Sequence, residues 1–141
     1  MSEGDEKIYK DIGKIYCPYF KDCVQFTRVG FEHLKFKNKY KARSAKDQNM
    51  RFKLLPLAVQ ILGLSHTLQN ISNRQRFEER TINNRREIGL MLVTYYEFTA
   101  VMSQKRIKII IKQIEGRDKI FLSVIPFFKQ KTPPEEGDGF S

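Results

Sequence analysis

The last third of the chain shows the clearest pattern of apolar and polar positions. Runs rich in β-branched and aromatic residues cover residues 90–102, 106–115 and 119–127, and the short segments SQK and EGRD separate them. Such runs with hairpin-length connections predict an antiparallel meander of three strands. In the middle run, isoleucines at every second position alternate with a set that includes two lysines. We therefore expect one fully apolar face that packs against helices and a second face that is at least partly wet.

Helical spacing comes earlier, after Ser44, which is a good N-cap residue with Asp47 in capping-box register. The apolar positions that follow keep to one side of a helix: Met50, Leu54, Leu57, Ala58, Ile61 and Leu62. Pro56 lacks a backbone donor and disfavours helical geometry at the residue before it. The pattern predicts either a kinked helix or two helices, the second beginning at Pro56, with Gly63 near the C-terminal end.

Shorter elements are expected on both sides of this helix. Residues 24–27 alternate as a strand does and would add a fourth strand, and the apolar spacing favours a short helix at 29–35. Residues 72–89 contain five arginines and three glutamates, a composition that fits either a solvated helix or an ordered basic loop. The predicted fold is α+β, with N-terminal helices packed on one face of a C-terminal antiparallel sheet of three to four strands.

The length of 141 residues suits a single domain, which we place at residues 14–130. Residues 1–13 are expected to be a mobile or helical lead-in, and residues 131–141, with Pro-Pro, two glycines and three acids, a disordered tail. The N-terminus is polar, and no apolar run approaches the roughly 20 residues of a membrane span, so we expect neither a signal peptide nor a membrane segment. Cys17 and Cys23 lack further cysteines to complete a zinc site, and reduced thiols suit a cytoplasmic protein.

The charge of the chain indicates a polyanionic partner. There are 26 Lys and Arg against 16 Asp and Glu, a formal net charge of +10, which favours nucleic acid or an acidic protein, with a merely basic soluble protein as the alternative. Residues 28–53 hold nine Lys or Arg against two acids, with four aromatic residues interleaved. Cations neutralise phosphates and aromatic rings stack on unpaired bases, so RNA is favoured over DNA; the alternative is a solvated helix face with the aromatic residues in the core. The residues predicted to hold phosphate are Lys35, Lys37, Arg43, Arg51, Arg74 and Arg76.

Sequence motifs for dinucleotide cofactors, P-loops, serine hydrolases and zinc proteases are absent, and we expect no cofactor and no metal. Metal-free cleavage of RNA needs a base for the 2′-hydroxyl, an acid for the leaving oxygen and cations for the transition state. His33 and His66 are the first candidates for acid and base because histidine titrates near neutrality; each is alternatively a structural histidine. Glu97 is the only acid in a run of otherwise uncharged residues and is either a base or half of a cross-strand ion pair. Tyr96 and Ser123 are second choices on the sheet.

Three segments carry a resemblance to a known family: VQFTRVGFEHL, LLPLAVQIL after a basic stretch, and the terminal KIFLSVIPF. They are similar to the small nuclease domains grouped as barnase–EndoU–colicin E5/D–RelE-like, especially the phage-associated members. The segments IYCPYF, KARSAKDQ, SHT, YYEF and SVIPFFKQ equally resemble small uncharacterised proteins of reduced-genome bacteria. The resemblance covers approximately residues 14–130. It implies metal-free cleavage of RNA, often tRNA, by a toxin or effector, with His33 in the Gly-x-x-His position and basic residues facing the sheet. Phe31 stands where a tryptophan is common, and the arginine block at 74–86 is an addition to the pattern.

We therefore expect a metal-independent endoribonuclease-like domain that cleaves or binds RNA such as tRNA. The alternatives are a non-catalytic nucleic-acid-binding or regulatory module on the same fold, and an adaptor for an acidic protein such as an inhibitor. A nuclease should place a histidine or Glu97 within about 4 Å of an Arg or Lys in a concave site. A binding module should show a flat basic face away from both histidines, and an adaptor should show an exposed apolar patch ringed by lysines.

Overall fold

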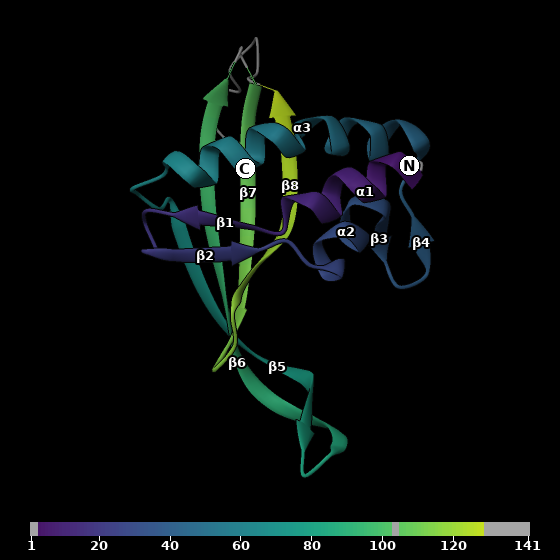
Figure 1. Cartoon of the computed structure of the whole chain (residues 1–141), viewed down its shortest axis with the longest axis vertical. Helices are drawn as coiled ribbons and strands as arrows, with labels where there is room; N and C mark the ends of the chain where they lie inside the picture. Colours follow the sequence, from purple (N-terminus) through teal and green to yellow (C-terminus); the bar gives the residue numbers. More distant parts are fainter. Residues whose placement is uncertain (1–2, 103–104, 129–141) are drawn as a thin grey trace, which may run out of the picture.

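The computed structural model describes residues 3–102 and 105–128, and within them the chain forms three helices and eight strands (Figure 1). In chain order these are α1 (Glu3–Ile12), β1 (Lys14–Cys17), β2 (Asp22–Gln25), α2 (Arg28–Lys35), β3 (Phe36–Asn38), β4 (Lys41–Ala42), α3 (Ala45–Leu64), β5 (Asn70–Ile82), β6 (Arg85–Met102), β7 (Lys105–Ile114) and β8 (Lys119–Phe128). Six strands form one sheet, and β3 and β4 form a separate two-stranded hairpin. The fold is therefore α+β, and the expected lead-in is largely helix α1. The expected disordered tail, 131–141, lies outside the described residues.

The six-stranded sheet has the order β1-β2-β8-β7-β6-β5. Antiparallel pairing of β6 with β7 and of β7 with β8 confirms the predicted meander. The expectation of three to four strands was wrong, because β5 joins one edge through β6 and the β1–β2 hairpin joins the other through β8. Strand β2 begins two residues before the predicted start and pairs with β8 in parallel, through Gln25 and Ile120.

Residues 72–89 form neither the solvated helix nor the basic loop that their composition predicts. They belong to a long hairpin in which β5 pairs with β6 from Asn70↔Glu97 to Ile82↔Arg85. Asn83 and Asn84 both have left-handed backbone angles, with φ of 52° and 64°, as a two-residue type I′ turn requires. Figure 1 shows that the hairpin extends well beyond the helices. Most described residues of its far part are exposed on both faces, so the pattern of one buried and one wet face that marks a half-buried strand is lost there.

Helix α3 is one continuous helix of 20 residues, although Pro56 lies inside it. Its N-terminus is as predicted, because the Oγ atom of Ser44 accepts a hydrogen bond of 3.1 Å from the backbone N–H of Asp47. Gly63 lies in the last turn, and the helix ends at Leu64 with Ser65 as the C-cap. Figure 1 shows α3 running across the strands of the sheet. Its buried side chains share one core with those of the central strands, so α3 covers one face of the sheet.

Helix α2, which confirms the predicted short helix, packs unusually close to β8. A Cβ atom added at Gly30 would lie 2.5 Å from the carbonyl oxygen of Phe121 and 2.5 Å from the hydroxyl oxygen of Tyr9. The Tyr9 side chain, on α1, is 2% exposed and donates a hydrogen bond of 2.6 Å to the carbonyl of Thr27. Glycine is therefore required at position 30 for α1, α2 and β8 to meet. This contact fixes the position of His33, one turn further along α2.

Candidate nucleic-acid cleft

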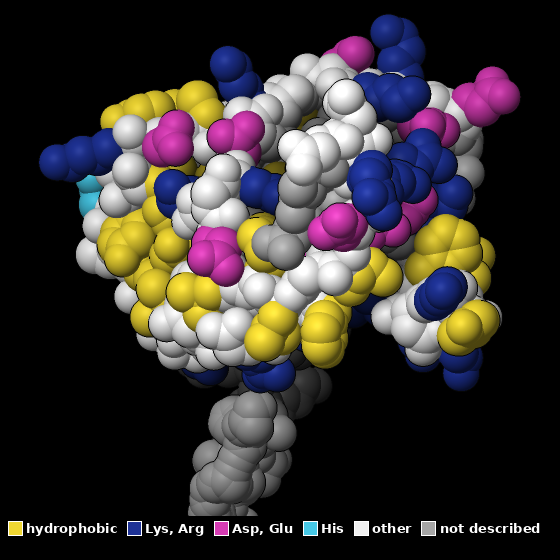
Figure 2. Space-filling view, turned by 90° about the horizontal axis from the view of Figure 1, so that it is seen from below, with side chains coloured by type: hydrophobic (Ala, Val, Ile, Leu, Met, Phe, Trp, Pro, Cys, Tyr) yellow, Lys and Arg dark blue, Asp and Glu magenta, His cyan; other side chains and the backbone are white. Residues whose placement is uncertain are grey.

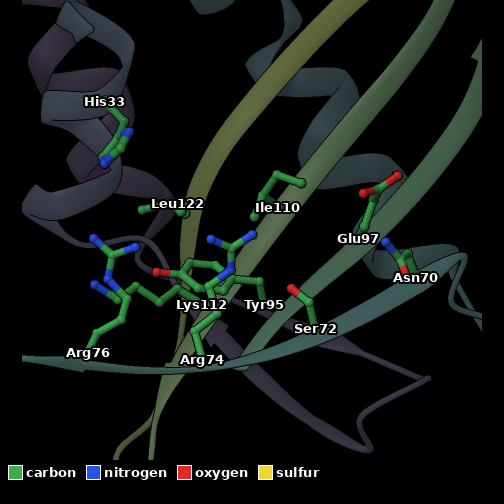
Figure 3. Close-up of a pocket in the computed structure, with 10 residues that line it drawn as sticks. All are labelled: His33, Asn70, Ser72, Arg74, Arg76, Tyr95, Glu97, Ile110, Lys112 and Leu122. Carbon is green, nitrogen blue, oxygen red and sulfur yellow. The ribbon is translucent and has the colours of Figure 1, made fainter. Parts of the chain in front are cut away.

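The two faces of the sheet have different surroundings. Ile107, Ile109 and Ile111 are fully buried in the core that α3 covers, so Ile110 and Lys112, which alternate with them, point to the opposite face. On that face lies a cleft of about 540 Å³, lined by residues of α2 and of strands β5 to β8. Figure 3 labels the ten residues that line it. This volume is within the range of ligand-binding clefts.

One part of the cleft is cationic. Arg74 and Arg76 lie two residues apart on β5 and so on one face of the strand, and both line the cleft. Figure 3 shows both side chains rising from β5 into the cleft. Within the described residues neither arginine has a carboxylate at ion-pair distance. Lys112 lines the same region, and its Nζ atom lies 3.3 Å from Glu78 Oε2. The two arginines therefore leave positive charge in the cleft that no described carboxylate balances.

His33 lines the cleft from α2 and points into it (Figure 3). Burial lowers the pKa of its imidazole below 6.5, and the positive charges of Arg43, Lys112 and Arg51 lower it further, against a smaller opposite effect of Glu32. The imidazole is therefore mainly neutral at neutral pH. Within the described part of the chain it makes no hydrogen bond, so both ring nitrogens remain available to a substrate.

Glu97 lies at the other end of the cleft, beside Asn70, its partner across the β5–β6 ladder (Figure 3). Its Oε2 atom is 3.4 Å from the Nζ atom of Lys108 on β7, and both side chains are about a quarter to a third exposed, at 24% and 32%. Of the two roles predicted for Glu97, a catalytic base or half of a cross-strand ion pair, the structure shows the ion pair. Ser72 also lines this end of the cleft. Amide, hydroxyl and carboxylate groups therefore face the cationic end along one groove.

Several residues predicted for the site lie elsewhere. His66 is exposed in the segment after α3 and does not line the cleft. Tyr96 points to the opposite face of β6, where its ring packs edge-on against Phe20 and its hydroxyl donates to Gln113 Oε1 at 3.2 Å. Ser123 is 8% exposed beside Ile110 and is not part of the cleft lining. Of the five candidates for catalysis, the structure brings His33 and Glu97 to the cleft.

Arg43 and Arg51, predicted to hold phosphate, are instead engaged inside the protein. Both pair with Asp47, at 3.4 Å and 2.9 Å, and their side chains are only 11% and 13% exposed. The Nε atom of Arg43 donates to the carbonyl oxygen of His33 at 2.9 Å, and the Nη1 atom of Arg51 donates to the carbonyl oxygen of Val124 at 2.8 Å. Arg43, just before α3, thus holds the backbone of His33 in place, and Arg51, within α3, ties that helix to β8. The positive charges of both contribute to the lowered pKa of His33.

The remaining lysines of the prediction lie beside the cleft rather than in it. Lys35 has its Nζ atom 5.4 Å from the ring centre of Phe31 and 5.6 Å from that of Phe36. Lys37 is exposed and lines a second, adjacent cavity. Sequence reasoning did not select Tyr95 and Lys112, which line the cleft. Lys112 carried a signal, since the alternation on β7 placed it on the wet face, but the pairing with β5 that closes the cleft was not predicted.

Net charge alone does not locate a site. Figure 2 shows Lys and Arg side chains spread over one face of the molecule with Asp and Glu side chains among them.

No group of three or more His, Cys, Asp or Glu residues that could hold a metal ion occurs within 3–102 and 105–128. The helices of this described part include none that is long and apolar enough to cross a membrane. Cys17 and Cys23 are both free thiols.

Comparison with known proteins adds no relative. The chain matches no family model, no curated protein and no solved structure.

Proposed function

We propose that the chain binds RNA in this cleft and cleaves it without a metal ion, as its resemblance to the barnase–EndoU–colicin E5/D–RelE-like nucleases implies. The observation that carries the proposal is the pair Arg74 and Arg76, which lack carboxylate partners in the described chain and share a concave cleft with the neutral imidazole of His33. Guanidinium groups bind phosphate oxygens in a bidentate manner and stay charged at any physiological pH. Phosphate and a proton acceptor would then meet in one site.

The residues of the cleft match the steps of metal-free RNA cleavage. His33 takes the proton of a ribose 2′-hydroxyl, whose oxygen attacks the adjacent phosphorus. The bond from phosphorus to the 5′-oxygen of the next nucleotide breaks, and that oxygen takes a proton from the hydroxyl of Tyr95, which lines the same cleft. Arg74 and Arg76 stabilise the charge that develops on the phosphate oxygens. The products are a 2′,3′-cyclic phosphate and a 5′-hydroxyl end.

The shape of the site favours cleavage over simple binding. The basic groups line a concave cleft rather than a flat face, and His33 is among them. This arrangement is the one expected of a nuclease, whereas a binding module would keep both histidines away from the basic surface.

A protein-binding role is the second candidate, because the far part of the β5–β6 hairpin exposes apolar side chains. Phe77 and Leu90 face each other across the hairpin and are 73% and 55% exposed, and Ile88 is 70% exposed. Exposed apolar patches of this kind mark contact sites for other proteins. If the patch serves a protein, a Phe77→Ser variant keeps the RNA affinity and cleavage rate of the wild type; a loss of RNA affinity would assign the patch to RNA instead.

The cleft is tested by the salt dependence of RNA binding. We compare the Arg74→Gln/Arg76→Gln double variant with a Lys46→Gln/Lys53→Gln control, which removes the same charge from exposed positions of α3 that do not line the cleft. For each phosphate that the variant no longer neutralises, the slope of log affinity against log salt concentration should fall by about 0.7. The proposal predicts a fall of about 1.4 in the first variant and little change in the control. Equal effects in the two variants would show that general charge, and not the cleft, binds RNA.

A further inference from the structure

A second cavity adjoins the cleft. It has a volume of about 380 Å³ and is lined by Glu32, His33, Phe36, Lys37, Asn38 and Lys39, from the end of α2 and from β3 and the turn that follows it. His33 lines both cavities, so they meet at the imidazole that we propose as the base. A chain bound in the cleft can therefore continue past His33 onto the β3–β4 hairpin.

The β3–β4 hairpin is unusually basic and unusually exposed. No acidic residue lies between Glu32 and Asp47, and four of the five lysines between them, at positions 35, 37, 39 and 41, lie in or directly beside the hairpin. Every residue from Phe36 to Ala42 is exposed. Of the four aromatic residues in the basic stretch, Phe31 is in the core and Phe52 packs against it, but Phe36 is 39% exposed and Tyr40 is 89% exposed. The hairpin thus presents two aromatic rings that add little to the core.

The turn of the hairpin holds Tyr40 in a defined place. The Oδ1 atom of Asn38 accepts a hydrogen bond of 2.8 Å from the backbone N–H of Tyr40. The Nζ atom of Lys39 lies 5.8 Å from the centre of the Tyr40 ring. An aromatic ring with a cation beside it matches a nucleotide, whose base stacks on the ring and whose phosphate meets the ammonium group.

We propose that the β3–β4 hairpin binds the single-stranded RNA segment next to the phosphate held in the cleft, with unpaired bases stacked on Tyr40 and Phe36 and phosphates held by Lys37 and Lys39. This inference rests on the proposed function of the cleft and adds the substrate class, RNA that is unpaired beside the cleavage site. Unpaired bases are required because the faces of paired bases are covered by their neighbours in a duplex. The lysines explain affinity for the backbone, and the exposed rings explain the selection of single strands.

The absence of tryptophan from the chain gives this proposal a direct test. A Tyr40→Trp variant carries one indole fluorophore at the proposed stacking position, and a Tyr16→Trp variant carries it on β1, where Tyr16 is 55% exposed and lines neither cavity. Titration with a single-stranded 12-nucleotide RNA should quench the fluorescence of Tyr40→Trp and leave that of Tyr16→Trp unchanged. A duplex of the same length should quench neither. Equal quenching of the two variants, or quenching of Tyr40→Trp by duplex as strongly as by single strand, would overturn the proposal.

The effects of substitutions on affinity separate the hairpin from the cleft. In a Tyr40→Ala variant the affinity for the 12-nucleotide RNA should fall about 5- to 150-fold, the loss associated with one stacked base. The affinity of this variant for a duplex of the same length should stay that of the wild type, because the faces of paired bases are covered. If Arg74→Gln/Arg76→Gln weakens binding but Tyr40→Ala does not, the hairpin proposal fails and the cleft stands. If the wild type binds no RNA, both fail.

Discussion

Substitution of Gly30 by alanine should loosen the contact that holds α2 against β8. The new Cβ atom would lie 2.5 Å from the carbonyl oxygen of Phe121, where ordinary contact begins at 3.4 Å, so α2 has to withdraw by the difference of 0.9 Å. The atoms that the new Cβ atom would meet belong to the backbone of β8 and to the buried side chain of Tyr9, and neither can move aside by rotating a side chain into solvent. Overpacking of this kind destabilises by about 3 kcal/mol at the upper end of its range, and the higher helix propensity of alanine returns about 1 kcal/mol. We expect a net loss of about 2 kcal/mol in the free energy of unfolding.

Gly63→Ala is the matched control, because that glycine also lies in a helix but a Cβ atom there would have its nearest neighbour at 3.9 Å. It should leave stability unchanged or raise it by up to about 1 kcal/mol. Urea unfolding followed by far-ultraviolet circular dichroism measures both variants. At a temperature where both remain folded, Gly30→Ala should also cleave RNA more slowly, since His33 moves with α2. Equal stability of the two variants would refute the close-packing argument.

Further predictions concern two titratable groups. Asp47→Asn should destabilise the fold by about 3 kcal/mol at pH 7, because it leaves two largely buried arginines without their carboxylate. The control Asp11→Asn, which breaks an ion pair with Lys7 whose side chains are 77% and 67% exposed, should change stability by less than about 0.5 kcal/mol. Burial raises the pKa of the Asp47 carboxyl, but the hydrogen bonds and positive charges of Arg51 and Arg43 outweigh burial, so the folded pKa is lowered. The stability that Asp47 contributes is therefore present above the unfolded pKa near 3.9 and is lost as the pH falls through the folded pKa. Acid titration of stability in wild type and Asp47→Asn checks this, and identical pH profiles would contradict it. The folded pKa of His33 is below 6.5, so kcat/KM for RNA cleavage should rise with pH to a plateau, with the midpoint of the rise below pH 6.5. A midpoint above pH 6.5 would exclude the neutral imidazole of His33 as the base. The same shift predicts stability that is complete above pH 6.5 and falls as the pH decreases toward the folded pKa, a decrease that His33→Ala should remove.

The parts of the fold that the sequence predicted are those where a local pattern and the tertiary environment agree. Strands β6, β7 and β8 carry β-branched runs with one buried face, and Ser44 caps α3 through the Asp47 backbone as its spacing indicates. Strand β5 was missed because solvent surrounds much of it and its polar composition hides the alternation. The Asn83–Asn84 pair was its available signal, since two adjacent residues that tolerate left-handed angles favour a type I′ hairpin.

Only part of the candidate site was predicted, because the chemistry of a residue can be read from the sequence but its neighbours in space cannot. His33 and Glu97 were selected by residue chemistry, and the structure places both in the cleft. Whether an arginine is available to a ligand depends on its neighbours in space. Arg43 and Arg51 flank Asp47 at four-residue intervals, a spacing that on a helix favours ion pairs and was the signal for their internal role. Arg74 lies in the cleft because of the β5–β6 register, which the sequence pattern did not reveal.

The most direct test of the central claim is incubation of the purified protein with total tRNA in EDTA, with His33→Ala and His66→Ala compared under the same conditions. Both substitutions leave the backbone carbonyl of residue 33 available to Arg43, so this hydrogen bond between α2 and Arg43 can still form. The account predicts discrete fragments with 2′,3′-cyclic phosphate ends from the wild type and from His66→Ala, and loss of these fragments in His33→Ala. Undiminished cleavage by His33→Ala, or salt-sensitive binding of tRNA with no cleavage by the wild type, would contradict it.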